Sequence, residues 1–361
     1  MIQLRLPVEP LPIVEPLVIR LRDTAQDLGP YDALLIDTSA TRREYDFHGF
    51  SVALEAPGST QLDRDVIMVV PGQASARRLI RAGSAHNTLV VTEQCDQFCV
   101  MCSQPPKKHH IDLFDYLETA ASLAPVGAYI GLSGGEPLLH KARLFGMLLS
   151  LSRSRPDLRF HILSNGQHFD RHDIPILAEI GIERILWGIP LYSADALTHD
   201  TIVKKDGAYD ILMESFVTLF EAGAMIELRT VVLKQNYECF PALASFIGTM
   251  LPFLDRWAIM QLENIGFARM NWGSSFKDTS TDFTNIGRSI NIAEAGGVSV
   301  QLYNFPLCSV PERYRPYAHA TISDWKNKHE PFCATCRARS ECGGFFEWYD
   351  HARGFKELGP L

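Results

Sequence analysis

The chain is 361 residues long, and 46% of its residues are hydrophobic while 21% are charged. This composition supports a folded core and excludes an intrinsically disordered chain. The formal net charge of -8 and the isoelectric point of about 5.8 lack the basic surplus of proteins that bind duplex DNA or tRNA. We therefore expect a globular protein and disfavour a nucleic acid as its partner.

The first 22 residues contain prolines and acidic residues in place of the basic segment and unbroken apolar run of a signal peptide. No segment approaches the roughly 20 apolar residues that a membrane span needs. We expect a cytoplasmic protein with no membrane partner. Seven of the eight cysteines fall into two groups, which in this compartment favours reduced thiolates that hold metal over disulfides.

Residues 1–86 mix short apolar runs with Gly, Pro and Asp turns, and the clearest runs are ALLID at 33–37 and DVIMVVPG at 65–72. This pattern predicts a small β-rich module.

From residue 87 onward, strand-like runs alternate with helical stretches of about 12 to 18 residues. The expected strands are 87–94, 128–133, 160–166, 184–193, 225–234 and 257–265. Six such repeats predict an α/β fold with a parallel sheet, because parallel strands need long crossovers and right-handed crossovers curl the sheet. We expect a partial (β/α)6 TIM-like barrel over residues 87–275.

Beyond residue 275 the pattern becomes irregular, with one more strand candidate at 298–305. Residues 276–361 are expected to form a cysteine-rich C-terminal extension.

The first cysteine group has the spacing CxxxCxxC and consists of Cys95, Cys99 and Cys102, directly after the first expected strand of the barrel. Three thiolates can ligate three irons of a 4Fe-4S cluster and leave the fourth iron open to another molecule. A structural zinc site is the alternative, but it needs a fourth ligand, and none lies at normal spacing. The position at the carboxyl end of a strand is where β/α barrels place active-site loops.

Two further motifs follow the next two strands, namely Ser133-Gly134-Gly135-Glu136-Pro137 and Ser164-Asn165-Gly166. The cysteine spacing followed by GGEP resembles the radical S-adenosylmethionine (SAM) superfamily. This resemblance implies a 4Fe-4S cluster that binds SAM at its open iron and cleaves it to a 5'-deoxyadenosyl radical. The residues expected to contact SAM are Met101, Ser133, Gly134, Gly135, Glu136, Ser164, Asn165 and Arg229.

The chemistry of each residue suggests its role in binding SAM. Glu136 offers an acceptor for the SAM ammonium, and the two glycines before it let the backbone approach a ligand. Arg229 lies in an apolar strand, where a buried charge is costly unless a carboxylate pairs with it. That carboxylate is expected from SAM or from the neighbourhood of Glu227. Tyr192 and His199 are candidates for the substrate site by position alone, and a role in the core is favoured for both.

The second cysteine group comprises Cys308, Cys333, Cys336 and Cys342. Four thiolates, two of them in a CxxC pair, suit either iron-sulfur or zinc. The family resemblance favours a second, auxiliary iron-sulfur cluster. Cys239 stands alone, and a buried free thiol is its expected state.

Several phrases between residues 83 and 350 resemble the His-Xaa-Ser system radical SAM maturase HxsC family, including 86–107, 306–308, 322–336 and 342–346. This resemblance implies a peptide maturase that abstracts hydrogen from a partner polypeptide with His-Xaa-Ser repeats, acts with a second radical SAM maturase, and receives electrons from a flavodoxin or ferredoxin. A radical SAM enzyme acting on tRNA or a small cofactor precursor, and a non-catalytic metal-binding scaffold for a partner maturase, are the alternatives.

Overall fold

The computed structural model describes residues 2–361. Its contacts divide the chain into two units. The first unit contains Met1–Val91, Ile111–Ser133 and His140–His161, and the second contains Thr92–His110, Gly134–Leu139 and Ile162–Leu361. Whether residues 1–86, 87–275 and 276–361 behave as separate domains stays a prediction.

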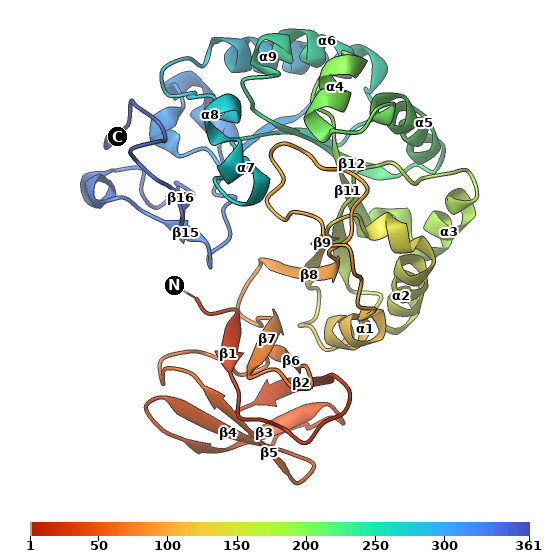
Figure 1. The fold of residues 1–361 in the computed structure, drawn as a ribbon, viewed down its shortest axis with the longest axis vertical. Helices are drawn as coiled ribbons and strands as arrows, with labels where there is room; N and C mark the ends of the chain where they lie inside the picture. Colours follow the sequence, from red (N-terminus) through yellow and green to blue (C-terminus); the bar gives the residue numbers. More distant parts are fainter. Residues whose placement is uncertain (1) are drawn as a thin grey trace. The chain divides into compact units, whose positions relative to one another are not determined.

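The N-terminal strands form a seven-stranded sheet of their own, with the order β1-β7-β6-β2-β3-β4-β5 (Figure 1). The strands are β1 (Arg5–Pro7), β2 (Leu17–Arg22), β3 (Asp32–Thr38), β4 (Arg42–Phe47), β5 (Phe50–Glu55), β6 (Val66–Val69) and β7 (Ser75–Ile80). Val8 pairs with Leu54, and the Glu9 N–H donates to the Ala53 carbonyl at 3.1 Å, so the chain after β1 meets β5 and both edges are covered. The predicted β-rich module is confirmed.

The core of this module combines apolar packing with buried ion pairs. Leu6, Ile19, Tyr45 and Ile67 are fully buried in it. The carboxylate of Asp32 accepts from Arg20 Nε at 2.6 Å and from Arg22 Nη1 at 3.1 Å. Burial opposes this charge, but the two guanidinium groups and the Gly29 N–H outweigh burial and lower the pKa of Asp32.

A second seven-stranded sheet has the order β14-β13-β12-β11-β10-β9-β8. Its strands are β8 (Asn87–Thr92), β9 (Tyr129–Gly134), β10 (Arg159–Leu163), β11 (Ile185–Pro190), β12 (Met225–Val231), β13 (Arg256–Met260) and β14 (Val300–Tyr303). The pairs β11–β12, β12–β13 and β13–β14 are parallel. All six expected strands and the seventh candidate are present, and the sheet is open at β8 and β14, which confirms the predicted partial α/β barrel.

Helices connect these strands, as parallel pairing requires. They are α1 (Phe114–Ser122), α2 (Lys141–Ser154), α3 (Asp173–Ile180), α4 (Ala196–Val203), α5 (Ala208–Glu221), α6 (Phe240–Met250), α7 (Gly266–Met270), α8 (Trp272–Ser275) and α9 (Thr284–Ala295). In α5 the residues Ala208, Leu212, Phe216 and Leu219 recur at helical spacing and are buried. None of the helices within residues 2–361 combines the length and apolar character that crossing a bilayer requires.

The cysteine-rich region after β14 has little regular structure, as expected. Its two short strands, β15 (Asn327–Lys328) and β16 (Phe345–Phe346), pair antiparallel. Phe345 and Phe346 are buried, and Phe346 stacks on Trp348 with ring centroids 6.0 Å apart. Aromatic packing therefore replaces long helices and strands here.

Replacing Asp32 by Asn should lower the free energy of unfolding of the N-terminal module by about 3 kcal/mol, because it leaves two guanidinium groups without their carboxylate. Since the folded-state pKa of Asp32 is lowered, its contribution is present above the unfolded pKa of about 3.9 and is lost as the pH falls below it. Hydrogen-deuterium exchange across residues 17–38 measures this change.

Asp37→Asn is the matched control, because Asp37 is exposed in the same strand and should change stability by less than about 0.5 kcal/mol. Equal effects of the two substitutions at pH 7 would contradict the role given to the buried pair.

Candidate functional site

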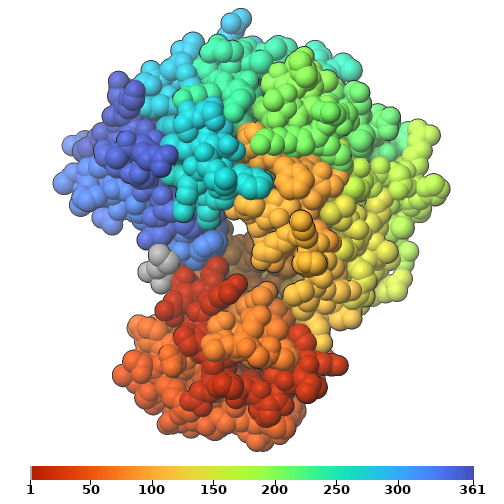
Figure 2. All heavy atoms as spheres, viewed as in Figure 1, coloured from red at the N-terminus to blue at the C-terminus, as the bar shows by residue number. Residues whose placement is uncertain are grey.

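The loop that carries the first cysteine group follows β8 and is held by two neighbouring elements. The N–H of Val100 donates to the carbonyl of Ile202 in α4 at 2.9 Å. On the other side, Asn271 Nδ2 donates to the Val100 carbonyl at 2.9 Å, and the Phe267 N–H donates to the Cys102 carbonyl at 2.8 Å. Figure 2 shows this loop, in orange, against the cyan segment that contains α7 and α8. The backbone that presents the cysteines is therefore fixed on both sides.

The three thiols Cys95, Cys99 and Cys102 are free, and all of them are half-buried. Burial raises the pKa of Cys95 to about 11 and raises that of Cys99 further, and the neighbouring thiols add to the effect on Cys99. Thiolates in this setting need a cation beside them, and a bound metal supplies it while displacing the protons. Within residues 2–361 no group of three or more Cys, His, Asp or Glu side chains is arranged to hold a single metal ion.

The GGEP segment lies against the backbone of the cysteine loop. Gly135 N donates to the Thr92 carbonyl at 2.9 Å, and Glu136 N donates to the Gln94 carbonyl at 2.7 Å. A Cβ on Gly134 would lie 1.9 Å from the Thr92 oxygen, and one on Gly135 would lie 2.0 Å from the Gln94 oxygen. Gly134 also has a φ of +139°. The glycines are therefore required for the approach of one backbone segment to another, and their expected approach to a ligand stays a prediction.

Glu136 is completely buried, and its carboxylate is used inside the chain. One oxygen accepts from the Leu138 N–H and from Ser164 Oγ, both at 2.8 Å, and the other accepts from the Asn165 N–H at 2.5 Å. Burial raises the pKa of Glu136 to about 7, although these hydrogen bonds act to lower it. Glu136 thus joins the end of β9 to the end of β10, and its expected role as an acceptor for an ammonium stays a prediction.

Asn165 connects the end of β10 to the cysteine loop. Its Nδ2 donates to Asp96 Oδ1 at 2.8 Å, and Asp96 lies next to Cys95 in the chain. The other oxygen of Asp96 accepts from Lys205 and lies 3.3 Å from His168 Nε2. Burial alone would raise the pKa of Asp96, but the three donors around it hold that pKa well below its usual value. The result is an anionic centre that ties the loop to two other segments.

Arg229 and Glu227 project from β12 two residues apart and form an ion pair. Glu227 is buried and also accepts from the hydroxyl of Tyr303 at 2.8 Å, while the Arg229 guanidinium lies 5.9 Å from the centre of the Tyr303 ring. The prediction that Arg229 needs a carboxylate is met by Glu227 itself. Several other donors of the guanidinium remain for a ligand.

Three other candidates, Met101, Tyr192 and His199, lie in the core. Met101, which was expected to contact SAM, is 8% exposed and packs in an apolar cluster with Tyr192 and Trp272. Burial lowers the pKa of His199 to about 4, and its Nδ1 accepts from the Tyr192 N–H at 3.3 Å. Ser133 is half-buried in β9 just before the two glycines.

The second cysteine group gathers around the β15–β16 hairpin. Cys308 packs against the apolar cluster that contains Cys333, and the Cys336 N–H donates to the Cys333 carbonyl at 3.3 Å. The N–H of Leu307, next to Cys308, reaches the sulfur of Cys342, so the four cysteines lie in one region. The sulfur of Cys342 accepts two backbone N–H groups, from Leu307 at 3.4 Å and from Gly344 at 3.3 Å. Backbone donors aimed at a sulfur stabilise a thiolate, so this group suits a four-thiolate metal site.

Sequence reasoning missed the residues that support the first group. Asp96 lies inside the cysteine motif, but nothing in the sequence connects it with Lys205 or His168. Gly266, with a φ of +58°, has backbone so close to Cys102 that a Cβ would lie 2.4 Å from its oxygen. The glycine was visible in the sequence, but its partner was not.

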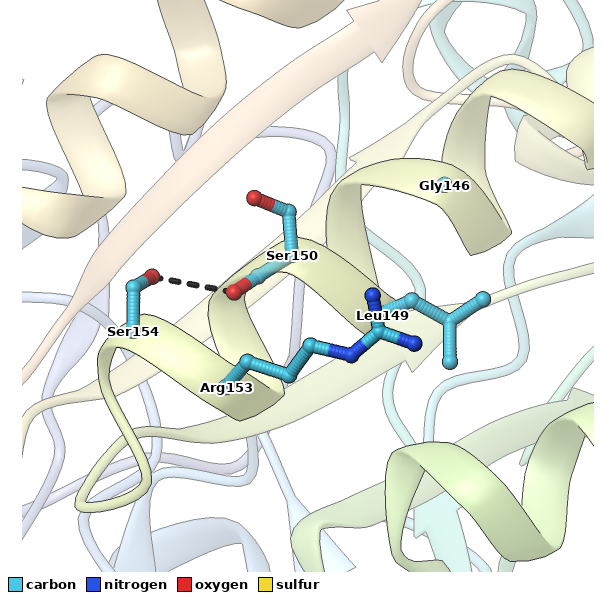
Figure 3. A pocket seen from close by; sticks show the side chains of 5 residues that line it. All are labelled: Gly146, Leu149, Ser150, Arg153 and Ser154. Atoms are coloured by element: carbon cyan, nitrogen blue, oxygen red, sulfur yellow. Dashed lines mark hydrogen bonds between the residues drawn. The ribbon is translucent and has the colours of Figure 1, made fainter.

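The pocket in Figure 3 lies on the outer side of α2 and contains none of these residues. It is lined by Gly146, Leu149, Ser150, Arg153 and Ser154. Ser154 Oγ donates to the Ser150 carbonyl at 3.0 Å, and Ser150 Oγ donates to Glu118 of α1 at 2.5 Å, so both hydroxyl groups are engaged within the chain. We assign this pocket no function.

Known proteins provide one family match and several structural similarities. Residues 89–247 match the family described as the Radical SAM superfamily. No match was found among the curated proteins. Among solved structures, Streptococcus suis SuiB bound to S-adenosylmethionine is 16% identical with a TM-score of 0.48, and the similarity covers 62% of this chain and 52% of SuiB. The chain therefore spans about half the length of SuiB.

Two further structures show a similar level of likeness. anSMEcpe with bound AdoMet and Cp18Cys peptide is 14% identical with a TM-score of 0.46, covering 59% of this chain and 63% of anSMEcpe. A domain of the pyruvate-formate lyase-activating enzyme from Bacteroides vulgatus is 14% identical with a TM-score of 0.38, covering 48% and 96%.

Replacing Gly134 by Ala should destabilise the fold by about 3 kcal/mol or more, because the added methyl would meet the Thr92 carbonyl and the backbone would be strained. Gly135→Ala should act similarly through the clash alone. Gly146→Ala is the control, since its Cβ meets no atom within 4 Å, and thermal unfolding would compare the three variants. A Gly134→Ala variant as stable as Gly146→Ala would contradict the close approach described above.

Proposed function

We propose that this chain is a radical SAM enzyme in which Cys95, Cys99 and Cys102 hold a 4Fe-4S cluster that binds SAM. Residues 89–247, which contain these cysteines, match the Radical SAM superfamily. The observation that carries this proposal is the pair of backbone bonds that joins the GGEP segment to the cysteine loop. They bring the ends of β8 and β9 together beside the three thiols. A loop of thiols, a glycine-lined strand end and a half-buried Asn165 thus occupy one edge of the sheet.

The cluster and SAM, when bound, supply the one-electron cleavage that yields a 5'-deoxyadenosyl radical. The residues of the chain would bind the cluster and SAM and orient them. The three thiols would ligate the irons, and the paired N–H and carbonyl groups around Gly134 and Gly135 would face the amino acid portion of SAM. Ser133, Ser164, Asn165, Met101 and Arg229 stay proposed SAM contacts. Glu136 and Asp96 are positioning residues, since their carboxylates are used to hold the strand ends and the loop.

The decisive experiment is the formation of 5'-deoxyadenosine from SAM by the anaerobically reconstituted and reduced protein, measured by liquid chromatography. Cys99→Ala should abolish the product, because the cluster loses one of three protein ligands. Cys239→Ala is the matched control, since Cys239 is a free cysteine at the start of α6 and outside both groups. If Cys99→Ala retained activity, the site assignment would be wrong, and no product from the unmodified chain would favour a non-catalytic scaffold.

We further propose that Cys308, Cys333, Cys336 and Cys342 hold an auxiliary iron-sulfur cluster. The support is the number of thiols, their closeness and the two N–H groups aimed at Cys342. Zinc is the alternative metal for this ligand set.

Iron, sulfide and zinc analysis of a Cys333→Ala/Cys336→Ala variant tests this assignment. The variant should lose about four irons and four sulfides relative to the unmodified chain, which is the content of one 4Fe-4S cluster. Cys239→Ala again serves as control and should lose none. Loss of zinc alone would refute the auxiliary cluster.

For the substrate, we propose a partner polypeptide with His-Xaa-Ser repeats, modified in the cytoplasm with a second radical SAM maturase. Electrons would come from a flavodoxin or ferredoxin. The support is the resemblance of residues 86–107, 306–308, 322–336 and 342–346 to the HxsC family, together with the acidic net charge, which suits a His-bearing partner. Binding of a His-Xaa-Ser repeat peptide, compared with its His→Ala version and with tRNA, tests this proposal. Binding of tRNA alone would refute it.

A further inference from the structure

Residues 353–361 run back across the second unit toward the second cysteine group. The Lys356 N–H donates to Asp278 Oδ2 at 3.0 Å, and the Glu357 N–H donates to Ser280 Oγ at 3.0 Å. Asp278 and Ser280 lie in the segment after α8. The dark blue end of the chain accordingly lies beside the cyan segment in Figure 2. The path of this segment is therefore fixed before it reaches the cysteines.

Apolar contacts fix the same segment. Phe355 is 4% exposed and lies between Phe276 and Tyr349, with ring centroids 5.6 Å and 6.0 Å away. The Phe355 N–H also donates to the Tyr349 hydroxyl at 3.0 Å. Leu358 packs against the apolar cluster that contains Cys333. Burying a phenylalanine is worth about 1.5–3 kcal/mol, so this segment is held in place by packing as well as by hydrogen bonds.

The last three residues of the segment meet two of the cysteines. The Leu361 N–H donates to Cys336 Sγ at 3.4 Å, and the Leu361 carbonyl accepts from the Arg337 N–H at 2.9 Å. Burial raises the pKa of the Cys308 thiol to about 11, and the Gly359 N–H acts against that rise. One sulfur, that of Cys336, therefore receives a backbone donor from the end of the segment, and Cys342 receives its donors from Leu307 and Gly344.

Backbone N–H groups aimed at metal-bound sulfurs matter for both candidate metals. They stabilise the negative charge on thiolates, and hydrogen bonds to the sulfurs and exclusion of water help to set the reduction potential of an iron-sulfur cluster. Residues that orient or support metal ligands typically change metal affinity by 10- to 100-fold when they are replaced.

We propose that residues 355–361 are part of the second cysteine site, covering its metal and donating hydrogen bonds to Cys308 and Cys336. This inference rests on the proposed metal at that site. Gly359 and Leu361 are then positioning residues. The loss of their N–H groups should weaken metal retention and should make the reduction potential of an auxiliary cluster more negative.

Proline substitution tests the donors one at a time, because proline lacks the N–H group. Leu361→Pro removes the donor to Cys336, and Leu361→Ala keeps it while removing the side chain. Gly359→Pro and Gly359→Ala form the second matched pair, since a Cβ at Gly359 meets no atom within 4 Å. A chain ending at Leu358 removes both donors.

The measurement is the rate at which excess EDTA removes metal from the second site, in full-length protein carrying Cys99→Ala and reconstituted with iron and sulfide or with zinc. Each proline variant should lose metal about tenfold faster than its alanine partner, and the chain ending at Leu358 should lose it faster still. Where iron-sulfur is present, an electrochemical titration should find a more negative potential in both proline variants.

Equal rates in the proline and alanine variants, with metal bound in all of them, would overturn this inference and leave the proposed metal site intact. Absence of metal from the second site in the chain with its natural residues 355–361 would overturn both. If a chain ending at Leu358 lost metal no faster than the full chain, the covering role would also be refuted.

Discussion

The backbone of the GGEP segment passes so close to the backbone after β8 that no side chain fits between them. A Cβ on Gly134 or Gly135 would lie within about 2 Å of a carbonyl oxygen, at 1.9 Å and 2.0 Å respectively. This approach allows the two backbone hydrogen bonds that join the ends of β8 and β9. The position of the cysteine loop depends on it, because the loop starts where these bonds end. The glycine pair is thus a structural condition for placing thiols at the sheet edge.

Two carboxylates extend this arrangement to the next strand. Glu136 is buried at the end of β9 and reaches Ser164 and the backbone of Asn165, while Asp96 reaches the side chain of Asn165 from the cysteine loop. A carboxylate withdrawn from water is costly unless donors or cations surround it, and the buried Glu136 and the half-buried Asp96 each have three such groups around them. The donors come from different segments, so satisfying the charge also fixes those segments. The same residues therefore carry stability and the geometry of the proposed site.

Much of the fold followed from the sequence. The strands were predictable because their apolar runs are bounded by turn residues, and parallel pairing followed from the helical stretches between them. The helix α1 (Phe114–Ser122) lies between the first two strands of the second sheet, where a helical stretch was expected. The sequence pointed to Glu136 and the glycines but not to their partners within the chain, because hydrogen bonds between residues 136 and 164 depend on tertiary contacts. Asp96 with Lys205, 109 positions apart, is a contact that no local pattern can indicate.

The two cysteine groups are held by different kinds of structure. This difference explains why the surroundings of the first group were easier to predict from the sequence than those of the second. The first group lies at a strand end of a regular sheet, so the order of motifs along the chain predicted its neighbours. The second group lies in a region of short turns, where Phe345 and Phe355 pack around the thiols and where residue 361 returns to Cys336. Irregular backbone needs partners for its N–H groups, and sulfur atoms are among the acceptors it finds here. Regular structure places the first group, whereas the second group itself helps to order the segment around it.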